Sequence, residues 1–147
     1  KGINTAFVTL HSGLGNFRPI EVEDLTKHKM DSEEMFITED NKEKINDAKM
    51  NKHKVCIVGT TTMKAIETAA TIGGKVKTYS GWTNKFIFPD YNFQVADAMI
   101  TNFHRPLSSM LIMVAAFGGY DLIMKAYKEA IDKKYKFLTY GDAMLII

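Results

Sequence analysis

Short apolar runs alternate along the chain with longer stretches in which apolar residues recur at helical spacing. Residues 5–10, 55–58 and 95–101 are rich in β-branched and aromatic side chains and predict strands. Residues 78–88 and 137–147 look extended by the same criteria. Because helical patterns lie between most of these runs, we expect an α/β layer structure with a mainly parallel sheet.

Capping residues and charges place the first helix at about residues 39–52. Thr38 is a favoured N-cap residue, acidic side chains fill the first turn, and lysines lie near the other end, which suits the helix dipole. Residues 21–35, just upstream, are charged and irregular. We interpret them as a surface connection.

Three further helices are predicted from hydroxyl and glycine signals. The second helix begins at Thr60 or Thr61 and ends before the glycine pair at 73–74. Two more follow Pro106 and are separated by a glycine pair at 118–119. The order of elements contains no internal repeat.

Composition narrows the class of protein without naming a function. The chain has 147 residues, 46% hydrophobic and 24% charged, which is enough for one ordinary domain. A net charge of +2 permits a nucleic-acid partner but does not by itself indicate one. The single cysteine, Cys56, excludes an internal disulfide and a cysteine metal site, and we expect it to be buried.

The two ends indicate a piece of a longer protein. The chain lacks an initiator methionine and stops within an apolar run at Ile147. No apolar stretch approaches the ~20 residues that span a bilayer, and no signal peptide precedes Lys1, so we expect a cytoplasmic protein. Uncovered apolar surface on such a fragment would favour self-association.

Several common site signatures are absent from the sequence. The Gly13-x-Gly15 pair lacks a third glycine and runs into Phe17-Arg-Pro19, so it fails the dinucleotide fingerprint. There is no Walker loop and no H-E-x-x-H motif, and the four histidines are scattered. We therefore expect no metal.

The remaining candidates for chemistry lie where predicted strands end. His11 follows a strand and could exchange a proton near neutral pH, while Gly13 and Gly15 would allow a ligand to approach the backbone. The alternative is a structural histidine beside a tight turn. Residues 60–62 place three hydroxyl groups and free backbone N–H groups at a helix start, which suits a phosphate or carboxylate; ordinary helix capping is the alternative.

Two more strand ends carry titratable side chains. His104 and Arg105 could act as acid or base and as anion clamp, or as a capping histidine and a solvated arginine. Tyr140 and Asp142 could present a hydroxyl and a carboxylate from the last strand, or form a turn in which the aspartate bonds its own backbone.

An ordered set of motifs covers essentially the whole chain. They are VTLHSGLGNFRP at 8–19, HKMDSE at 28–33, VGTT at 58–61 with Glu67, FPDY at 88–91, TNFH at 101–104 with Pro106, AFGG at 116–119 and YGDAM at 140–144. Together they resemble the C-terminal part of the S-adenosylmethionine:tRNA ribosyltransferase-isomerase family of queuosine biosynthesis.

The resemblance implies a larger enzyme of which residues 1–147 form the C-terminal portion of the α/β catalytic domain, without the N-terminal segment and an inserted all-β domain. It implies transfer and isomerisation of the ribosyl part of S-adenosylmethionine, the co-substrate, onto 7-aminomethyl-7-deazaguanine in the tRNA anticodon. Epoxyqueuosine-tRNA, adenine and methionine are the implied products. The fragment alone is expected to be inactive.

Residue chemistry at the matched positions suggests roles in that reaction. His11 and His104 are the candidates for proton transfer. The candidates for binding substrate are Gly13, Gly15, Arg18, Thr60, Thr61, Thr62, Asn102, Arg105, Tyr140 and Asp142. Among these, Arg105 stands where the family usually has an apolar residue, and Lys64 stands where arginine is usual. Lysine cannot reproduce bidentate arginine contacts.

Two other classes of function remain open on the sequence alone. The segment could be a non-catalytic RNA-binding or folding module, or an α/β enzyme that acts on a small nucleotide. A requirement for tRNA during adenine release would separate these alternatives from the ribosyltransferase.

Overall fold

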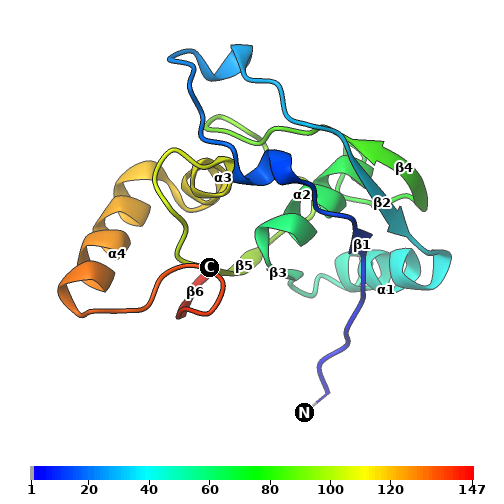
Figure 1. Cartoon of the computed structure of the whole chain (residues 1–147). Coiled ribbons are helices and arrows are strands. Elements are labelled where there is room, and N and C mark those ends of the chain that lie inside the picture. Colours follow the sequence, from blue (N-terminus) through cyan, green and yellow to red (C-terminus); the bar gives the residue numbers. More distant parts are fainter. Residues whose placement is uncertain (1) are drawn as a thin grey trace.

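The computed structural model describes residues 2–147, which form six strands and four α-helices with two short 3-10 helices (Figure 1). The strands are β1 Thr9–Leu10, β2 Glu33–Ile37, β3 Cys56–Val58, β4 Tyr79–Thr83, β5 Ala98–Asn102 and β6 Ala143–Ile146. The helices are α1 Glu39–Met50, α2 Thr60–Ala69, α3 Ser109–Gly118 and α4 Tyr120–Asp132, with 3-10 turns η1 Leu14–Phe17 and η2 Leu25–Lys27.

The strands form two three-stranded sheets, in the orders β1-β2-β4 and β3-β5-β6. The predicted α/β class is confirmed, but the prediction of a mainly parallel sheet is wrong. Only β3 and β5 pair in parallel among the described strands; β1 with β2, β2 with β4 and β5 with β6 are antiparallel. The chain returns from α4 through a turn beside β5, where the Leu138 N–H donates to the Phe103 carbonyl, so β6 enters against the direction of β5.

Strand β2 lies partly in the segment that the sequence assigned to a surface connection. Its side chains alternate in the manner of a half-buried strand, with Glu33, Met35 and Ile37 pointing inward. The sequence pattern does not reveal this alternation, because the first inward residue, Glu33, is acidic and not apolar. That buried glutamate becomes important at the functional site.

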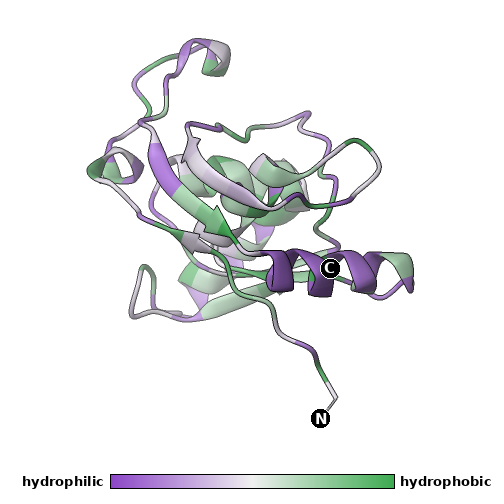
Figure 2. Cartoon of the chain, turned by 90° about the vertical axis from the view of Figure 1, so that its right-hand side faces the viewer, coloured by the Kyte–Doolittle hydropathy of each residue, from purple (hydrophilic) through white to green (hydrophobic). Residues whose placement is uncertain are grey.

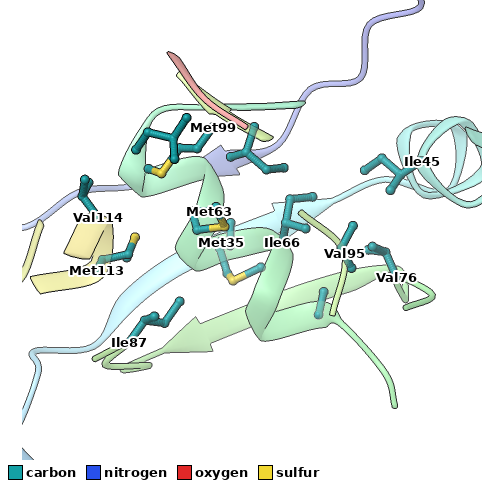
Figure 3. Packing of buried hydrophobic residues seen from close by; sticks show 14 of the residues in the cluster. Met35, Ile45, Met63, Ile66, Val76, Ile87, Val95, Met99, Met113 and Val114 are labelled. Carbon is teal, nitrogen blue, oxygen red and sulfur yellow. The ribbon is translucent and has the colours of Figure 1, made fainter. Parts of the chain in front are cut away.

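Helix α2 is the centre of the hydrophobic core. It contacts β1 and β4 of one sheet and β3 of the other, and most of its residues are buried. Met63 and Ile66 belong to one hydrophobic cluster with Met35 from β2 and Met99 from β5 (Figure 3). A helix that is buried almost all round fixes its own N-terminus firmly relative to both sheets.

Helix α1 is strongly hydrophilic, as Figure 2 shows, and Ile45 is its buried residue. Side-chain bonds to the neighbouring backbone hold it in place. The Asn46 amide donates to the Val76 carbonyl and accepts from the Val76 N–H, and the Lys49 ammonium pairs with Asp97 at 3.1 Å. The observed helix agrees with the predicted range within two residues.

Within residues 2–147, one face of the β3-β5-β6 sheet leaves apolar side chains exposed. Ile57 of β3 is buried on the side of α2, whereas Cys56 and Val58 are exposed on the other side. Val58 pairs in register with Ile100, which pairs with the exposed Leu145. We call Val58, Ile100 and Leu145 the outer apolar row. The expectation of a buried Cys56 is wrong because its side chain lies on this exposed face.

Within residues 2–147, no single helix is long and apolar enough to cross a membrane. Helices α3 and α4 reach the necessary length and apolar composition only when they are taken together, and the chain bends by 116° between them.

We predict that the isolated 147-residue chain self-associates through the outer apolar row. Exposed apolar side chains on neighbouring strands gain free energy when they are covered. Leu145→Lys should weaken association at least tenfold in sedimentation or light-scattering measurements. Ile72→Lys is the matched control, because Ile72 is also fully exposed but lies outside this face. Equal effects of the two changes would contradict the prediction.

Candidate functional site

A cavity of about 380 Å³ opens where the segment after β1, the start of α2 and the end of β5 converge. Its walls also include the start of α3 and the segment before β6. The lining residues are Ser12, Asn16, Phe17, Met30, Gly59, Thr60, Thr61, Lys64, Lys85, Thr101, Asn102, His104, Arg105, Ser109, Met110, Met113, Leu138 and Thr139.

The glycine-containing segment 12–17 forms one wall. Gly13 donates its backbone N–H to Glu33 Oε1 at 2.8 Å. A Cβ on Gly15 would lie 2.5 Å from the Asp31 carboxylate, so close approach of two chain segments explains that glycine. The predicted His11 is not in the cavity lining; its ring packs edge-on against Phe36, with ring centroids 5.9 Å apart.

The start of α2 forms the second wall. Gly59 is the N-cap with φ of +92°, and no side chain among the described residues caps this helix start. Thr60 and Thr61 line the cavity, as expected for a ligand-binding helix start, whereas Thr62 does not. The first-turn N–H groups and the positive end of the helix dipole therefore favour an anion here.

A buried ion pair joins these two walls. Lys64 of α2 places its ammonium 2.5 Å from Glu33 Oε2, and the two side chains are 3% and 2% exposed. The other carboxylate oxygen of Glu33 accepts from the Gly13 N–H and, at 2.6 Å, from the Asn16 amide. One carboxylate is thus bonded to the helix and to the glycine-containing segment at once.

His104 lies on the third wall, just past the end of β5. Its Nε2 is 2.7 Å from the Thr101 hydroxyl, and its backbone N–H donates to the Tyr127 hydroxyl at 2.7 Å. Burial lowers the pKa of His104 to about 4, because the charged imidazolium loses solvation. The side chain is therefore neutral at pH 7 and can accept a proton.

The two predicted arginines lie at different places. Arg105 is exposed and lines the cavity. Arg18 lies outside the lining and makes a loose, exposed ion pair with Asp31 at 3.9 Å. Exposed pairs of this kind contribute little to stability.

The C-terminal turn presents different residues from those expected. Leu138 and Thr139 line the cavity, whereas Tyr140 is 99% exposed and Asp142 accepts the Lys136 N–H at 2.7 Å. The predicted Asn102 lines the cavity, and its amide also donates to the Gly141 and Asp142 carbonyls. The alternative of a turn held by aspartate therefore describes this segment.

Lys85 lines the cavity, although the sequence indicates it only as a cation for tRNA phosphates and not as one of the substrate-binding candidates. Its ammonium lies 3.2 Å from the Tyr91 hydroxyl, which donates to the buried Glu67. Burial and the nearby carboxylate raise the pKa of Tyr91 to about 12. Glu67 also accepts backbone N–H groups of residues 94–96, so this network fixes the loop behind Lys85.

Residue type alone did not mark Glu33 as part of the site. The sequence signal for Glu33 is an acidic residue at an inward position of a strand. This signal can be seen only after residues 33–37 are recognised as a strand. The described residues contain no group of three or more histidine, cysteine, aspartate or glutamate side chains that could hold a metal ion.

Comparison with known proteins agrees with the motif pattern. A family model described as a queuosine biosynthesis protein matches residues 1–146. Proteins named S-adenosylmethionine:tRNA ribosyltransferase-isomerase from Phocaeicola vulgatus and Bacteroides fragilis are 60% and 61% identical over the whole chain. The chain spans 42% of the length of each of these relatives.

A solved structure shows the same fold. The crystal structure of S-adenosylmethionine tRNA ribosyltransferase from Thermotoga maritima superposes with a TM-score of 0.73 at 39% identity, covering 78% of this chain and 40% of that one. An α/β segment with a cavity at strand ends is typical of a domain that binds small substrates. The chain belongs to the queuosine biosynthesis protein family.

The lowered pKa of His104 predicts a pH dependence of stability. Above about pH 6.5 the histidine is neutral in both the folded and the unfolded chain, so it has no effect. Between about pH 6.5 and 4 the unfolded chain takes up a proton that the folded chain resists, so the free energy of unfolding should fall by on the order of 3 kcal/mol.

His104→Asn should remove this component of the pH dependence. Urea unfolding of the wild type and the variant at several pH values measures it. Parallel pH profiles for the two proteins would contradict the assignment.

Proposed function

We propose that this segment carries part of the active site of an S-adenosylmethionine:tRNA ribosyltransferase-isomerase. In the proposed reaction, the ribosyl part of S-adenosylmethionine moves to 7-aminomethyl-7-deazaguanine in the tRNA anticodon and is isomerised. Adenine and methionine leave. Close relatives bear the enzyme's name. Residues from four of the sequence motifs, at 8–19, 28–33, 58–61 and 101–104, line the cavity described above.

The start of α2 is the proposed anchor for the methionine carboxylate. Thr60 and Thr61 offer backbone N–H groups and hydroxyls on the cavity wall, where the helix dipole favours negative charge. The Lys64 ammonium adds positive charge nearby, although Glu33 balances much of it. The anchor would hold the co-substrate by the part that does not react.

His104 is the proposed proton carrier. The observation that carries the proposal is its place in the cavity lining just past β5, where its ring contacts the Thr101 hydroxyl. The reaction needs a base to remove a proton beside the sulfonium and an acid to assist the departure of adenine. Because burial lowers its pKa to about 4, His104 is neutral at pH 7 and has a lone pair that can receive a proton, although it is a weaker base than an ordinary histidine. Its protonated form is correspondingly a stronger acid than an ordinary imidazolium, which suits the step in which adenine leaves.

Other candidate residues have weaker support. Asn102 and Arg105 line the cavity and could contact the nucleoside or a phosphate. His11 remains the candidate for a second proton carrier because it adjoins Ser12 of the wall, although His11 itself is not among the lining residues. Ribose contacts by Tyr140 and Asp142 would require the turn to rearrange, since the Asp142 carboxylate already bonds to Lys136.

The direct test is adenine release from S-adenosylmethionine in the presence of precursor tRNA. The assay uses a chimera in which these 147 residues replace the matching segment of the Bacteroides fragilis relative. We call this chimera the complete-length protein. We expect release that depends on tRNA. Release without tRNA would favour a small-nucleotide enzyme, and RNA binding without release would favour a non-catalytic module.

His104→Gln should lower turnover of the complete-length protein by ~10²–10⁴-fold while it remains folded, because general acid-base groups typically contribute that much. Steady-state kinetics and circular dichroism measure the two effects. Ser80→Ala, at an exposed position on β4 outside the cavity lining, is a control that should retain turnover. Wild-type turnover in a folded His104 variant would overturn the catalytic assignment.

Binding of precursor tRNA should weaken steeply as salt concentration rises. The expected phosphate contacts are Arg18, Lys27, Lys29, Lys85 and Arg105, and each neutralised phosphate releases counterions. Arg105→Gln should reduce the slope of log K against log salt by about one. A salt-independent affinity would argue against an RNA partner.

A further inference from the structure

Glu33 combines deep burial with three strong hydrogen-bond donors. The carboxylate is 2% exposed and receives the Lys64 ammonium, the Gly13 N–H and the Asn16 amide. A buried ion pair often contributes little net stability, because desolvation offsets the attraction, and apolar residues of similar size can replace it. Stability alone therefore gives no strong reason for this arrangement.

The partners of Glu33 belong to two different walls of the cavity. Lys64 lies on α2, one turn after the threonines at the helix start. Asn16 lies in segment 12–17 and also donates to the Ser12 hydroxyl at 2.9 Å, so the bond from Asn16 to Glu33 also positions Ser12, and both residues line that wall. The segment is also held by the short 3-10 helix η1, whose C-cap Arg18 N–H donates to the Gly15 carbonyl at 3.3 Å, and by the adjacent His11 N–H, which donates to the Glu34 carbonyl at 2.8 Å.

Glu33 itself does not line the cavity. It would therefore act through other residues and would not touch a substrate. We propose that Glu33 is a positioning residue. Its Oε2 atom is anchored by Lys64 on the rigid helix α2, and its Oε1 atom holds segment 12–17 at the distance from the helix start that S-adenosylmethionine requires. This role rests on the proposed function of the cavity.

The test compares two double variants that share Lys64→Met and differ only at residue 33. Glu33→Gln with Lys64→Met removes both charges but keeps a carbonyl oxygen that can accept from Gly13 and Asn16. Glu33→Met with Lys64→Met removes both charges and the acceptor. Any direct contribution of Lys64 to binding cancels in this comparison, and neither variant leaves a buried unpaired charge.

In the complete-length protein, the double variant with Glu33→Met should have a KM for S-adenosylmethionine at least tenfold higher than the double variant with Glu33→Gln. Such a factor is expected for one or two lost hydrogen bonds. The KM for tRNA should agree within about twofold, and thermal unfolding should show both proteins folded. Glu34→Gln, at the next position of β2, should leave all these values unchanged.

Hydrogen exchange gives a second readout that needs no turnover. In the 147-residue chain, the backbone amides of segment 12–17 should exchange at least tenfold faster in the Glu33→Met pair than in the Glu33→Gln pair, while α2 remains equally protected. Equal exchange and equal KM in the two variants would overturn the positioning role. Absence of adenine release by the wild type would instead overturn the proposed function, leaving the exchange result to stand by itself.

Discussion

The buried contact between Lys64 and Glu33 is the interaction on which the site depends. Lys64 is part of the helix that fills the core between the two sheets, so its ammonium is fixed by packing. The other oxygen of Glu33 bonds to segment 12–17, which contains the short 3-10 helix η1, and so links that segment to the fixed helix. The packing of α2 in the hydrophobic core thus fixes one partner of the ion pair beside the cavity, and the core residue Met113 contributes to the cavity lining. An isolated glycine-containing loop could not hold that shape, because its backbone loses much entropy on ordering.

The second constraint is the partial burial of His104. Its contacts with Thr101 and Tyr127 hold the ring and backbone beside the cavity, and the loss of solvation keeps the imidazole neutral. A neutral histidine next to a helix start that favours anions suits a cationic co-substrate bearing a carboxylate. A shifted pKa of this kind is a common feature of functional sites.

The sequence predicted the helices well, because their caps and glycine ends are local signals. Residues 60–61 and 104–105 were identified in the same way, from hydroxyls, a histidine and an arginine at strand ends, and they do meet at one cavity. Strand β2 was missed because its inward acid breaks the apolar pattern. Pairing direction depends on contacts distant in sequence, so the antiparallel pairs could not be predicted from local patterns. Tyr140 and Asp142 have reactive side chains, yet a tight turn directs them elsewhere.

The central claim is that one cavity, shaped by Glu33 and Lys64, receives S-adenosylmethionine. The most direct measurement is a crystal structure of the complete-length protein with S-adenosylmethionine bound. The account predicts the methionine carboxylate at the N–H groups of Thr60 and Thr61, with the sulfonium between segment 12–17 and His104. Ligand density at another surface, with this cavity empty and the Glu33 contacts unchanged, would contradict it.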